Sequence, residues 1–216
     1  MDKYIEQHKK RLSYMPWLYY SLKPKQLQWA QTWQKDVQKK LTELETVKIG
    51  KDCFISPDAH IFAEPGRDII IGNRVTIAAN VVLHGPITIG DGVSLNSGVL
   101  IDGGAKGVFI GKNTRIASGV YIYAFNHATS PNRLIKDQPV ISKGIHIGED
   151  VWLSSNVGIT DGNNIGSYSV VGMGAIVTHD VPEWAIVAGV PAKVIGDRRM
   201  SKDVFKANDK SPPNSD

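Results

Sequence analysis

From Ile49 to Thr178, an aliphatic residue recurs at every sixth position, with two short interruptions and one long one. This period fits neither an α-helix, which repeats about every 3.6 residues, nor a single long strand, which alternates residue by residue. It is typical of a parallel β-helix, in which each hexad is one short strand plus one turn and stacked coils share an aliphatic core. The sequence therefore predicts an all-β fold with these in-phase residues: Ile49, Ile55, Ile61, Ile71, Ile77, Leu83, Ile89, Leu95, Ile101, Ile110, Ile116, Ile122, Ile147, Leu153, Ile159, Ile165, Val171 and Val177.

The hexads also divide the chain. No hexad precedes residue 47, and an amphipathic pattern that starts at Pro24 predicts a helix to roughly Glu45. Such a helix would cover the first coil, whose open end exposes unpaired backbone groups. The expected parts are 1–46 (helical and aromatic cap), 47–182 (β-helix), 183–200 (C-terminal segment) and 201–216 (polar tail, expected to be disordered).

An aromatic cluster precedes the predicted helix. We expect these rings to pack onto the cap, and contact with a membrane surface is the alternative. The cluster consists of Tyr14, Trp17, Tyr19 and Tyr20.

Composition narrows the function classes. The net charge is +4 and the pI is about 9.0, but the basic residues do not form one stripe, so a nucleic-acid partner is not expected. A cationic rim for an anionic cofactor is the preferred interpretation. The single Cys53 excludes an internal disulfide, and we expect it to be a buried structural thiol. Residues 1–11 lack the apolar core of a signal peptide, and no apolar run reaches membrane-spanning length, so a cytoplasmic location is expected.

The coil geometry brings separated residues together. Three hexads make one triangular coil, so residues eighteen apart stack at about 4.8 Å. His84 is thus expected to stack on Asp102, and Asp102 on Tyr123 after a three-residue insertion is counted. His127 follows at the mouth of 128–146, a segment that has no hexads and is too long for a turn. We expect a protruding loop there, and loops of this length inside a repeat are usually functional.

The end of the β-helix resembles a known family. Between Ile147 and Ile195 the chain reads IGEDVWL, VVGMGAIVT and AGVPAKVI in that order. This stretch resembles the closing coils of hexapeptide-repeat acetyltransferases, in particular the maltose, galactoside and serine acetyltransferases and the sugar O-acetyltransferases of surface polysaccharide pathways. The resemblance implies a left-handed β-helix that assembles as a homotrimer, with acetyl-CoA held between neighbouring subunits.

Acetyl transfer from a thioester needs a base, an oxyanion donor and aligned substrates. Imidazole suits the base because its pKa lies near neutrality. Of the six histidines only His127 lies at the loop mouth, where it matches the family's catalytic histidine. The resemblance implies that Asn96 and Asp102 line the acceptor pocket, and the ladder adds Tyr123 and His84 as candidates. The alternative for Asn96 is a stacked asparagine in a turn that hydrogen-bonds backbone groups.

The resemblance also implies the cofactor residues. The backbone amide of Ser155 would face the thioester carbonyl, and the pantetheine arm would run beside Gly172, Met173 and Gly174. Thr178 and Lys193 match positions near the nucleotide, where Arg198 is expected to help Lys193 pair with phosphate. His179 stands where a basic residue is usual. Trp152 is expected to pack under the loop, and no metal site is expected.

The prediction is an acetyl-CoA-dependent acyltransferase that acetylates a sugar hydroxyl by direct attack. N-acetylation of an amino-sugar nucleotide is the nearest alternative, since both reactions use the same base and donor. A γ-class carbonic anhydrase would need paired histidine ligands for zinc, and a non-catalytic β-helix scaffold would bind no CoA.

Overall fold

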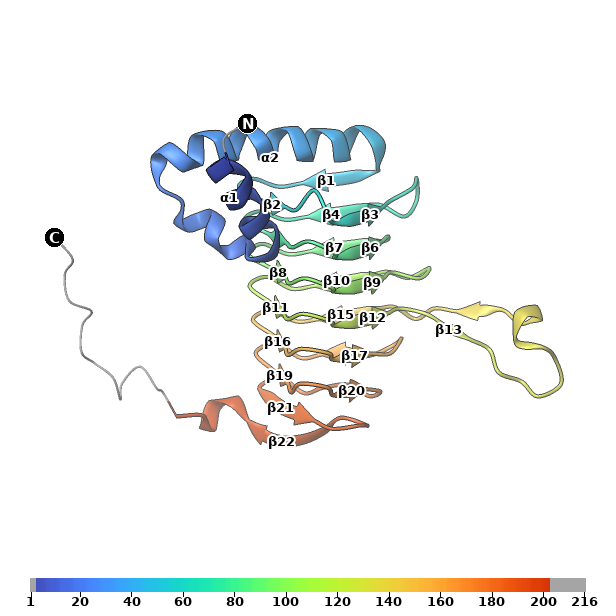
Figure 1. Cartoon of the computed structure of the whole chain (residues 1–216). Coiled ribbons are helices and arrows are strands. Elements are labelled where there is room, and N and C mark those ends of the chain that lie inside the picture. The colour runs from blue at the N-terminus through green and yellow to red at the C-terminus, as the bar shows by residue number, and fades with distance from the viewer. Residues whose placement is uncertain (1–2, 203–216) are drawn as a thin grey trace.

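The computed structural model describes residues 3–202, and nearly all of them belong to one parallel β-helix and its cap (Figure 1). Three sheets form the sides of a triangular prism, which confirms the predicted fold class. Sheet A contains β1 (Val47–Ile49), β4 (Ile69–Ile71), β7 (Ile87–Ile89), β10 (Val108–Ile110), β15 (Ile145–Ile147) and β18 (Asn164–Ile165). Sheet B contains β2 (Phe54–Ile55), β5 (Thr76–Ile77), β8 (Ser94–Leu95), β11 (Arg115–Ile116), β16 (Trp152–Leu153), β19 (Val170–Val171), β21 (Ala185–Ala188) and β22 (Lys193–Asp197). Sheet C contains β3 (His60–Phe62), β6 (Val82–His84), β9 (Leu100–Asp102), β12 (Tyr121–Tyr123), β17 (Gly158–Ile159) and β20 (Ile176–Val177).

The in-phase aliphatic residues form the core. On sheet B they pair directly from coil to coil and are almost fully buried, and each buried side chain contributes roughly 1.5–3 kcal/mol relative to exposure. This column consists of Ile55, Ile77, Leu95, Ile116, Leu153 and Val171.

The glycines that follow the in-phase residues of sheet A lie at a crowded corner. A Cβ on Gly72 would come within 2.4 Å of Asp91 Oδ1 and 2.8 Å of the Asp91 amide nitrogen. A Cβ on Gly90 would meet the Lys112 amide nitrogen at 2.7 Å. Successive coils approach each other too closely here for any side chain, which explains the recurring Ile-Gly pairs.

The cap closes the first coil with side-chain amides. The predicted helix is α2 (Pro24–Leu44), and it crosses the open end of the prism (Figure 1). Gln34 is 2% exposed, donates to the Ile55 carbonyl at 3.0 Å and accepts from the Ile55 amide at 2.8 Å. It thereby supplies the two hydrogen bonds that a further strand would make. Nearby, Gln38 donates to the carbonyl of Cys53, and burial raises the pKa of that thiol.

The sequence did not predict α1 (Lys3–Tyr14) or the 3₁₀ helix η1 (Pro16–Ser21). The four residues of the predicted aromatic cluster differ in their environment. Tyr19 is buried with its ring 5.5 Å from that of Phe54, and the Tyr20 hydroxyl donates to the Asp52 carbonyl at 2.9 Å, as the packing interpretation expects. Tyr14 and Trp17 are instead 47% and 48% exposed.

The segment expected as a protruding loop is a hairpin, and it extends far from the prism (Figure 1). β13 (Asn126–His127) pairs antiparallel with β14 (Val140–Ile141), and η2 (Ile135–Asp137) lies near its tip. The next strand of the prism, β15, already begins at Ile145, so this segment ends before residue 146, where the sequence predicted its end.

The last coil is followed by a reversal of direction. β21 continues sheet B in parallel, and β22 pairs with it antiparallel before η3 (Arg198–Met200). Of the tail expected at 201–216, residues 203–216 lie outside the described residues. Within residues 3–202, no helix has both the length and the apolar character required to cross a bilayer.

Candidate active site

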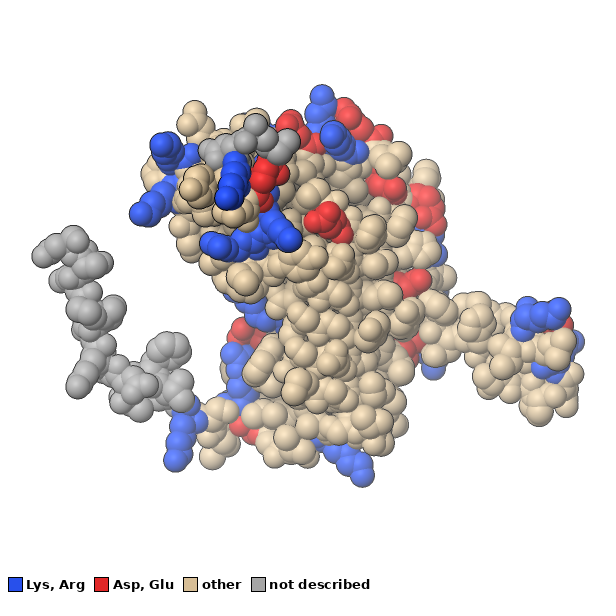
Figure 2. All heavy atoms as spheres, in the orientation of Figure 1, with Lys and Arg blue, Asp and Glu red and all other residues tan. Residues whose placement is uncertain are grey.

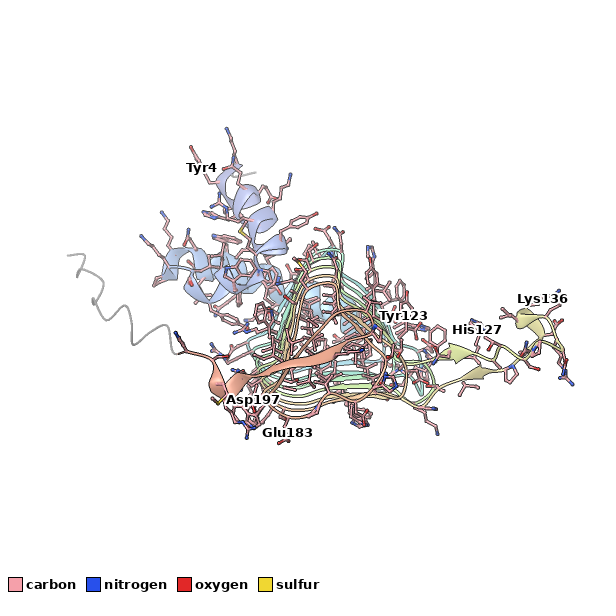
Figure 3. All side chains as sticks on the ribbon, turned by 90° about the horizontal axis from the view of Figure 1, so that it is seen from below. Tyr4, Tyr123, His127, Lys136, Glu183 and Asp197 are labelled. Carbon is pink, nitrogen blue, oxygen red and sulfur yellow. The ribbon has the colours of Figure 1, made fainter. Side chains whose placement is uncertain are left out.

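His127 stands where the hairpin leaves the prism. It pairs with Val140 across the hairpin, and its ring lies 6.2 Å from the Phe125 ring in an edge-on arrangement. Phe125 in turn lies edge-on to Tyr123, with ring centroids 5.8 Å apart. Seen along the prism, Tyr123 lies at its corner and His127 beyond it toward Lys136 (Figure 3). The imidazole is exposed and can meet a ligand from solvent.

A hollow of about 460 Å³ opens beside this histidine on the outer face of sheet C. Its floor is Gly158, which lies between Tyr121 above and Ile176 below in the outward column of sheet C. Glycine leaves a space there that a side chain would fill. The hollow is lined by Tyr121, Tyr123, Phe125, Asn126, His127, Gly158, Ile159, Thr160 and Ile176. It is mostly apolar, with polar groups at the His127 end.

The predicted ladder is present. His84 pairs with Asp102, and Asp102 with Tyr123, on neighbouring strands of sheet C. His84 Nδ1 lies 3.2 Å from Asp102 Oδ2, and the amide of Gly104 donates to Asp102 Oδ1 at 2.9 Å. A second groove of about 520 Å³ runs along this ladder and shares Tyr123 with the hollow.

Two further charges border the ladder. Arg67 Nη2 lies 3.8 Å from Asp102 Oδ1, and its Nε lies 3.0 Å from Glu64 Oε1. Glu64 Oε1 is also 3.7 Å from Nε2 of His84. The groove therefore presents two carboxylates held by a guanidinium and an imidazole, a set that can accept hydrogen bonds from hydroxyl or amino groups of an acceptor.

Asn96 lies elsewhere. It follows β8 at the corner between sheets B and C, whereas Asp102 ends β9 at the corner between sheets C and A. Neither groove is lined by Asn96, so one chain does not place it in a pocket with Asp102 as expected. Its Oδ1 is buried without a hydrogen-bond partner among the described residues.

The pantetheine candidates gather at the same corner as Asn96. The Gly174 amide donates to the Ser155 carbonyl at 3.0 Å, and the Ala175 amide donates to the Gly172 carbonyl at 3.1 Å. Met173 is 73% exposed between them. The structure brings Ser155, Gly172, Met173 and Gly174 together, across the width of sheet C from the ladder.

The nucleotide candidates are not brought together. Lys193 begins β22 opposite Ala188, whereas Arg198 follows the far end of the strand, roughly 15 Å away. Arg198 Nη1 donates to the carbonyls of Asp150 and Tyr168 at 3.0 and 3.2 Å and lies 3.0 Å from the Asp150 carboxylate. Its guanidinium thus holds the last coils together, and within one chain it does not lie beside Lys193.

Thr178 directly follows β20, and its Oγ1 lies 2.9 Å from Nδ1 of His179. These two polar groups therefore contact each other at the corner beyond β20.

Two sequence interpretations need correction. Trp152 is 51% exposed on sheet B, between Arg115 and Val170, whereas the hairpin leaves from sheet C. It therefore does not pack under the loop. The basic excess also does not form a rim around the CoA candidates, because Lys9, Lys10 and Arg11 lie in the cap at the opposite end of the prism from β22 (Figure 1).

Sequence reasoning missed Tyr121, Phe125, Gly158 and Thr160 as lining residues. A signal for Gly158 existed: it precedes the in-phase Ile159, at the outward position that Leu100 and Tyr121 occupy in the preceding coils. No group of three or more His, Cys, Asp or Glu side chains in residues 3–202 is arranged to hold a metal ion.

Comparison with known proteins bears on this arrangement. The model of the hexapeptide repeat of succinyl-transferase matches residues 46–84, 86–124 and 140–179, and the bacterial transferase hexapeptide model matches residues 68–103. Galactoside O-acetyltransferase of Escherichia coli is 32% identical over 67% of this chain, which spans 64% of that enzyme. WbbJ of Escherichia coli, to which O-acetyl transfer in lipopolysaccharide biosynthesis is provisionally attributed, is 38% identical over 66% of this chain and 74% of its own length.

A solved structure is similar over a wider span. AntD, an N-acyltransferase of Bacillus cereus crystallised as a point mutant with dTDP-4-amino-4,6-dideoxyglucose and coenzyme A, superposes with a TM-score of 0.67 at 26% identity. The match covers 79% of this chain and 92% of that one. The repeat matches extend over more than half of the sequence, and together with these relatives they show that the chain belongs to the hexapeptide-repeat acetyltransferase family.

Proposed function

We propose that this protein transfers an acetyl group from acetyl-CoA to a sugar hydroxyl, with His127 as the general base. The single observation that carries the proposal is the position of the His127 imidazole, exposed at the polar end of the apolar hollow on sheet C. An acyl chain suits the apolar part of such a hollow, and an imidazole at its edge can reach an acceptor proton.

In the proposed reaction the His127 imidazole removes the proton of the acceptor hydroxyl while the acceptor oxygen attacks the thioester carbonyl. The backbone amide of Ser155 donates to the oxyanion of the tetrahedral intermediate. As the carbon–sulfur bond breaks, the imidazolium returns the proton to the CoA thiolate, so the base is regenerated and no acyl-enzyme forms. Asp102, Tyr123 and His84 hold the acceptor in the adjoining groove.

The proposed site needs two copies of the chain. His127 and the ladder lie at one edge of sheet C, and Ser155, Met173 and Asn96 lie at the other. If neighbouring prisms stand parallel with these edges facing, the base of one copy meets the thioester held by the next. A homotrimer closes this head-to-tail contact into a ring. Lys193, Thr178 and His179 would lie near the nucleotide of CoA.

N-acylation of an amino-sugar nucleotide is the second candidate. The likeness to AntD over 79% of this chain favours it, because that enzyme was crystallised with an amino-sugar nucleotide. The carboxylates of Glu64 and Asp102 suit an amino group as well as a hydroxyl. The first candidate rests on the two O-acetyltransferase relatives, which are more similar in sequence.

Calorimetric titration of acetyl-CoA into wild-type and His127→Ala protein tests the proposal, followed by thiol-release assays with galactosides and dTDP-amino sugars. We expect both proteins to bind acetyl-CoA and the variant to lose about 10²–10⁴-fold in turnover, the usual contribution of a general base. His146→Ala is the control, because that imidazole is stacked on Phe109 on sheet A. Near-normal turnover of the His127 variant would exclude this base. Absence of CoA binding would favour the scaffold alternative, and zinc in the purified protein would favour the carbonic anhydrase alternative.

A further inference from the structure

The segment 3–44, which contains the helices α1, η1 and α2 of the cap, is strongly basic. Residues 3–44 contain nine basic and three acidic residues, a net charge of +6, whereas the full chain has a net charge of +4, so the remainder is −2. Figure 2 shows Lys and Arg side chains clustered over the cap at the upper left. The basic residues are Lys3, Lys9, Lys10, Arg11, Lys23, Lys25, Lys35, Lys39 and Lys40, and the acidic ones are Glu6, Asp36 and Glu43.

α1 has two different faces. Its inner face is fixed to the protein: Leu12 is 2% exposed, the Ala79 amide donates to the Ser13 carbonyl at 2.6 Å, and the His8 ring stacks on Trp29 at 6.3 Å. Its outer face contains cations and aromatic rings, and the only acid of α1, Glu6, lies on the flank with Lys9 at 2.9 Å. On that flank Lys10 and Tyr14 also border a hollow that contains Glu6 and Asp58. The exposed outer residues, at helical spacing, are Lys3, Tyr4, Gln7, Lys10, Arg11 and Tyr14.

The chain continues this surface with two exposed apolar side chains. Met15 is 44% exposed and Trp17 is 48% exposed, and no ring stacks on Trp17 among residues 3–202. In the same 3₁₀ helix Tyr19 is buried against Phe54, so η1 is anchored to the body while Trp17 stays exposed. Seen along the prism, α1 projects away from the coils with Tyr4 at its far end (Figure 3).

We propose that the outer face of α1, together with Met15 and Trp17, docks on an anionic phospholipid membrane. Lysine and arginine attract anionic headgroups, and Trp and Tyr favour the boundary between headgroups and acyl chains. The surface combines both features: cations and Tyr rings lie on one face of α1, and Trp17 lies on the 3₁₀ helix that follows it. It lies at the far end of the prism from the CoA candidates, so it does not serve the cofactor. The proposal does not depend on acetyl transfer.

Co-sedimentation with lipid vesicles tests this directly on the full-length chain. We expect binding to vesicles containing about one third phosphatidylglycerol, weak binding to pure phosphatidylcholine, and loss of binding at about 0.5 M salt, where charges are screened within about 4 Å. Lys10→Glu/Arg11→Glu should weaken binding at least tenfold. Trp17→Ser should weaken it several-fold, because the apolar anchor is lost while the net charge is unchanged.

The matched control is Arg133→Glu/Lys136→Glu, which makes the same charge change on exposed residues of the distant hairpin. Circular dichroism and thermal melting check that each variant is folded. Equal weakening by the two double variants would show that only net charge matters and would overturn the proposal, as would equal binding to neutral vesicles or no vesicle binding. It would also be overturned if the α1 variants changed the oligomeric mass, since the face would then lie between copies, or if duplex DNA bound this face more tightly than vesicles.

Discussion

Gly158 pairs in register with Tyr121 on the outer face of sheet C, and the hollow beside His127 exists because this rung has no side chain. The rungs above it are occupied by Val82, Leu100 and Tyr121, and the rung below by Ile176. A single glycine thus separates an apolar ridge into two parts at the level of the candidate base.

Filling this space should impair function without unfolding the protein. A Cβ on Gly158 would meet only the Cδ1 of Ile176, at 2.8 Å, and that atom is the far end of a flexible side chain. We expect Gly158→Val to melt within a few degrees of wild type and to lose at least tenfold in kcat/KM. Steady-state kinetics and thermal melting would measure this. Thr88→Ile, at an outward position of sheet A, should affect neither; equal losses in both variants would mean that the hollow is not the site.

The two cations of the C-terminal segment should have different effects. Lys193→Ala should raise the KM for acetyl-CoA about three- to tenfold, because the proposed partner of the CoA phosphates, an exposed ammonium, is removed. Arg198→Ala should instead lower the melting temperature and leave that KM nearly unchanged, since its guanidinium already holds the Asp150 and Tyr168 carbonyls. The opposite pattern would return Arg198 to the nucleotide site.

Gln34 should be essential to the stability of the cap. Gln34→Leu keeps the volume but leaves the buried amide and carbonyl of Ile55 without their partner, which costs about 2–4 kcal/mol. Urea denaturation would measure the change in the free energy of unfolding. Gln31→Leu, at an exposed position on the same helix, should change it by less than about 0.5 kcal/mol. Similar values for both would show that water replaces the Gln34 hydrogen bonds.

Tyr20 should make the protein sensitive to alkaline pH. Burial, followed by the charge of Cys53, raises the pKa of Tyr20 from 10.0 to about 12, so the folded state favours the neutral phenol. Stability from this group is full below pH 10, where the unfolded chain is still protonated, and is lost as the pH rises from 10 to 12. The ring is 39% exposed, so the loss should stay below about 2 kcal/mol.

Alkaline titration of the unfolding free energy would reveal this loss, and Tyr20→Phe should flatten the curve between pH 10 and 12. Tyr14→Phe removes the same hydroxyl from an exposed ring and is the matched control. A Tyr20→Phe curve identical to wild type would show that other groups cause the alkaline loss.

The ladder of His84, Asp102 and Tyr123 could be predicted because the register of a β-helix follows from its period alone. The same arithmetic shows why Asn96 lies apart from Asp102 within one chain, and why Trp152 does not pack under the hairpin. Asn96 follows the second hexad of its coil and Asp102 the third, so the two residues lie at different corners of the prism. Trp152 belongs to the second hexad of its coil, whereas the hairpin follows a third hexad, so the two lie on different sheets. Counting hexads from the corner would have separated these residues.

Other features had no period to reveal them. α1 buries few apolar residues, so its sequence carries a weak periodic signal, although its outer face is ordered by helical spacing. The separation of Arg198 from Lys193 depends on the antiparallel return of β22, which no hexad records. Sequence reasoning succeeds where packing repeats and fails where the chain folds back on itself.

The two ends of the prism are closed by different means, and this limits the addition of further coils or of other copies of the chain. An open parallel coil is a template on which another copy can add strands without limit, as in a filament. On sheet B, the Gln34 amide occupies the backbone groups of β2 at one end, and β22 covers β21 in the opposite direction at the other. The rod therefore has a fixed length, and His127, which leaves from the fourth strand of sheet C, stays at a constant height roughly 15 Å from the capped end.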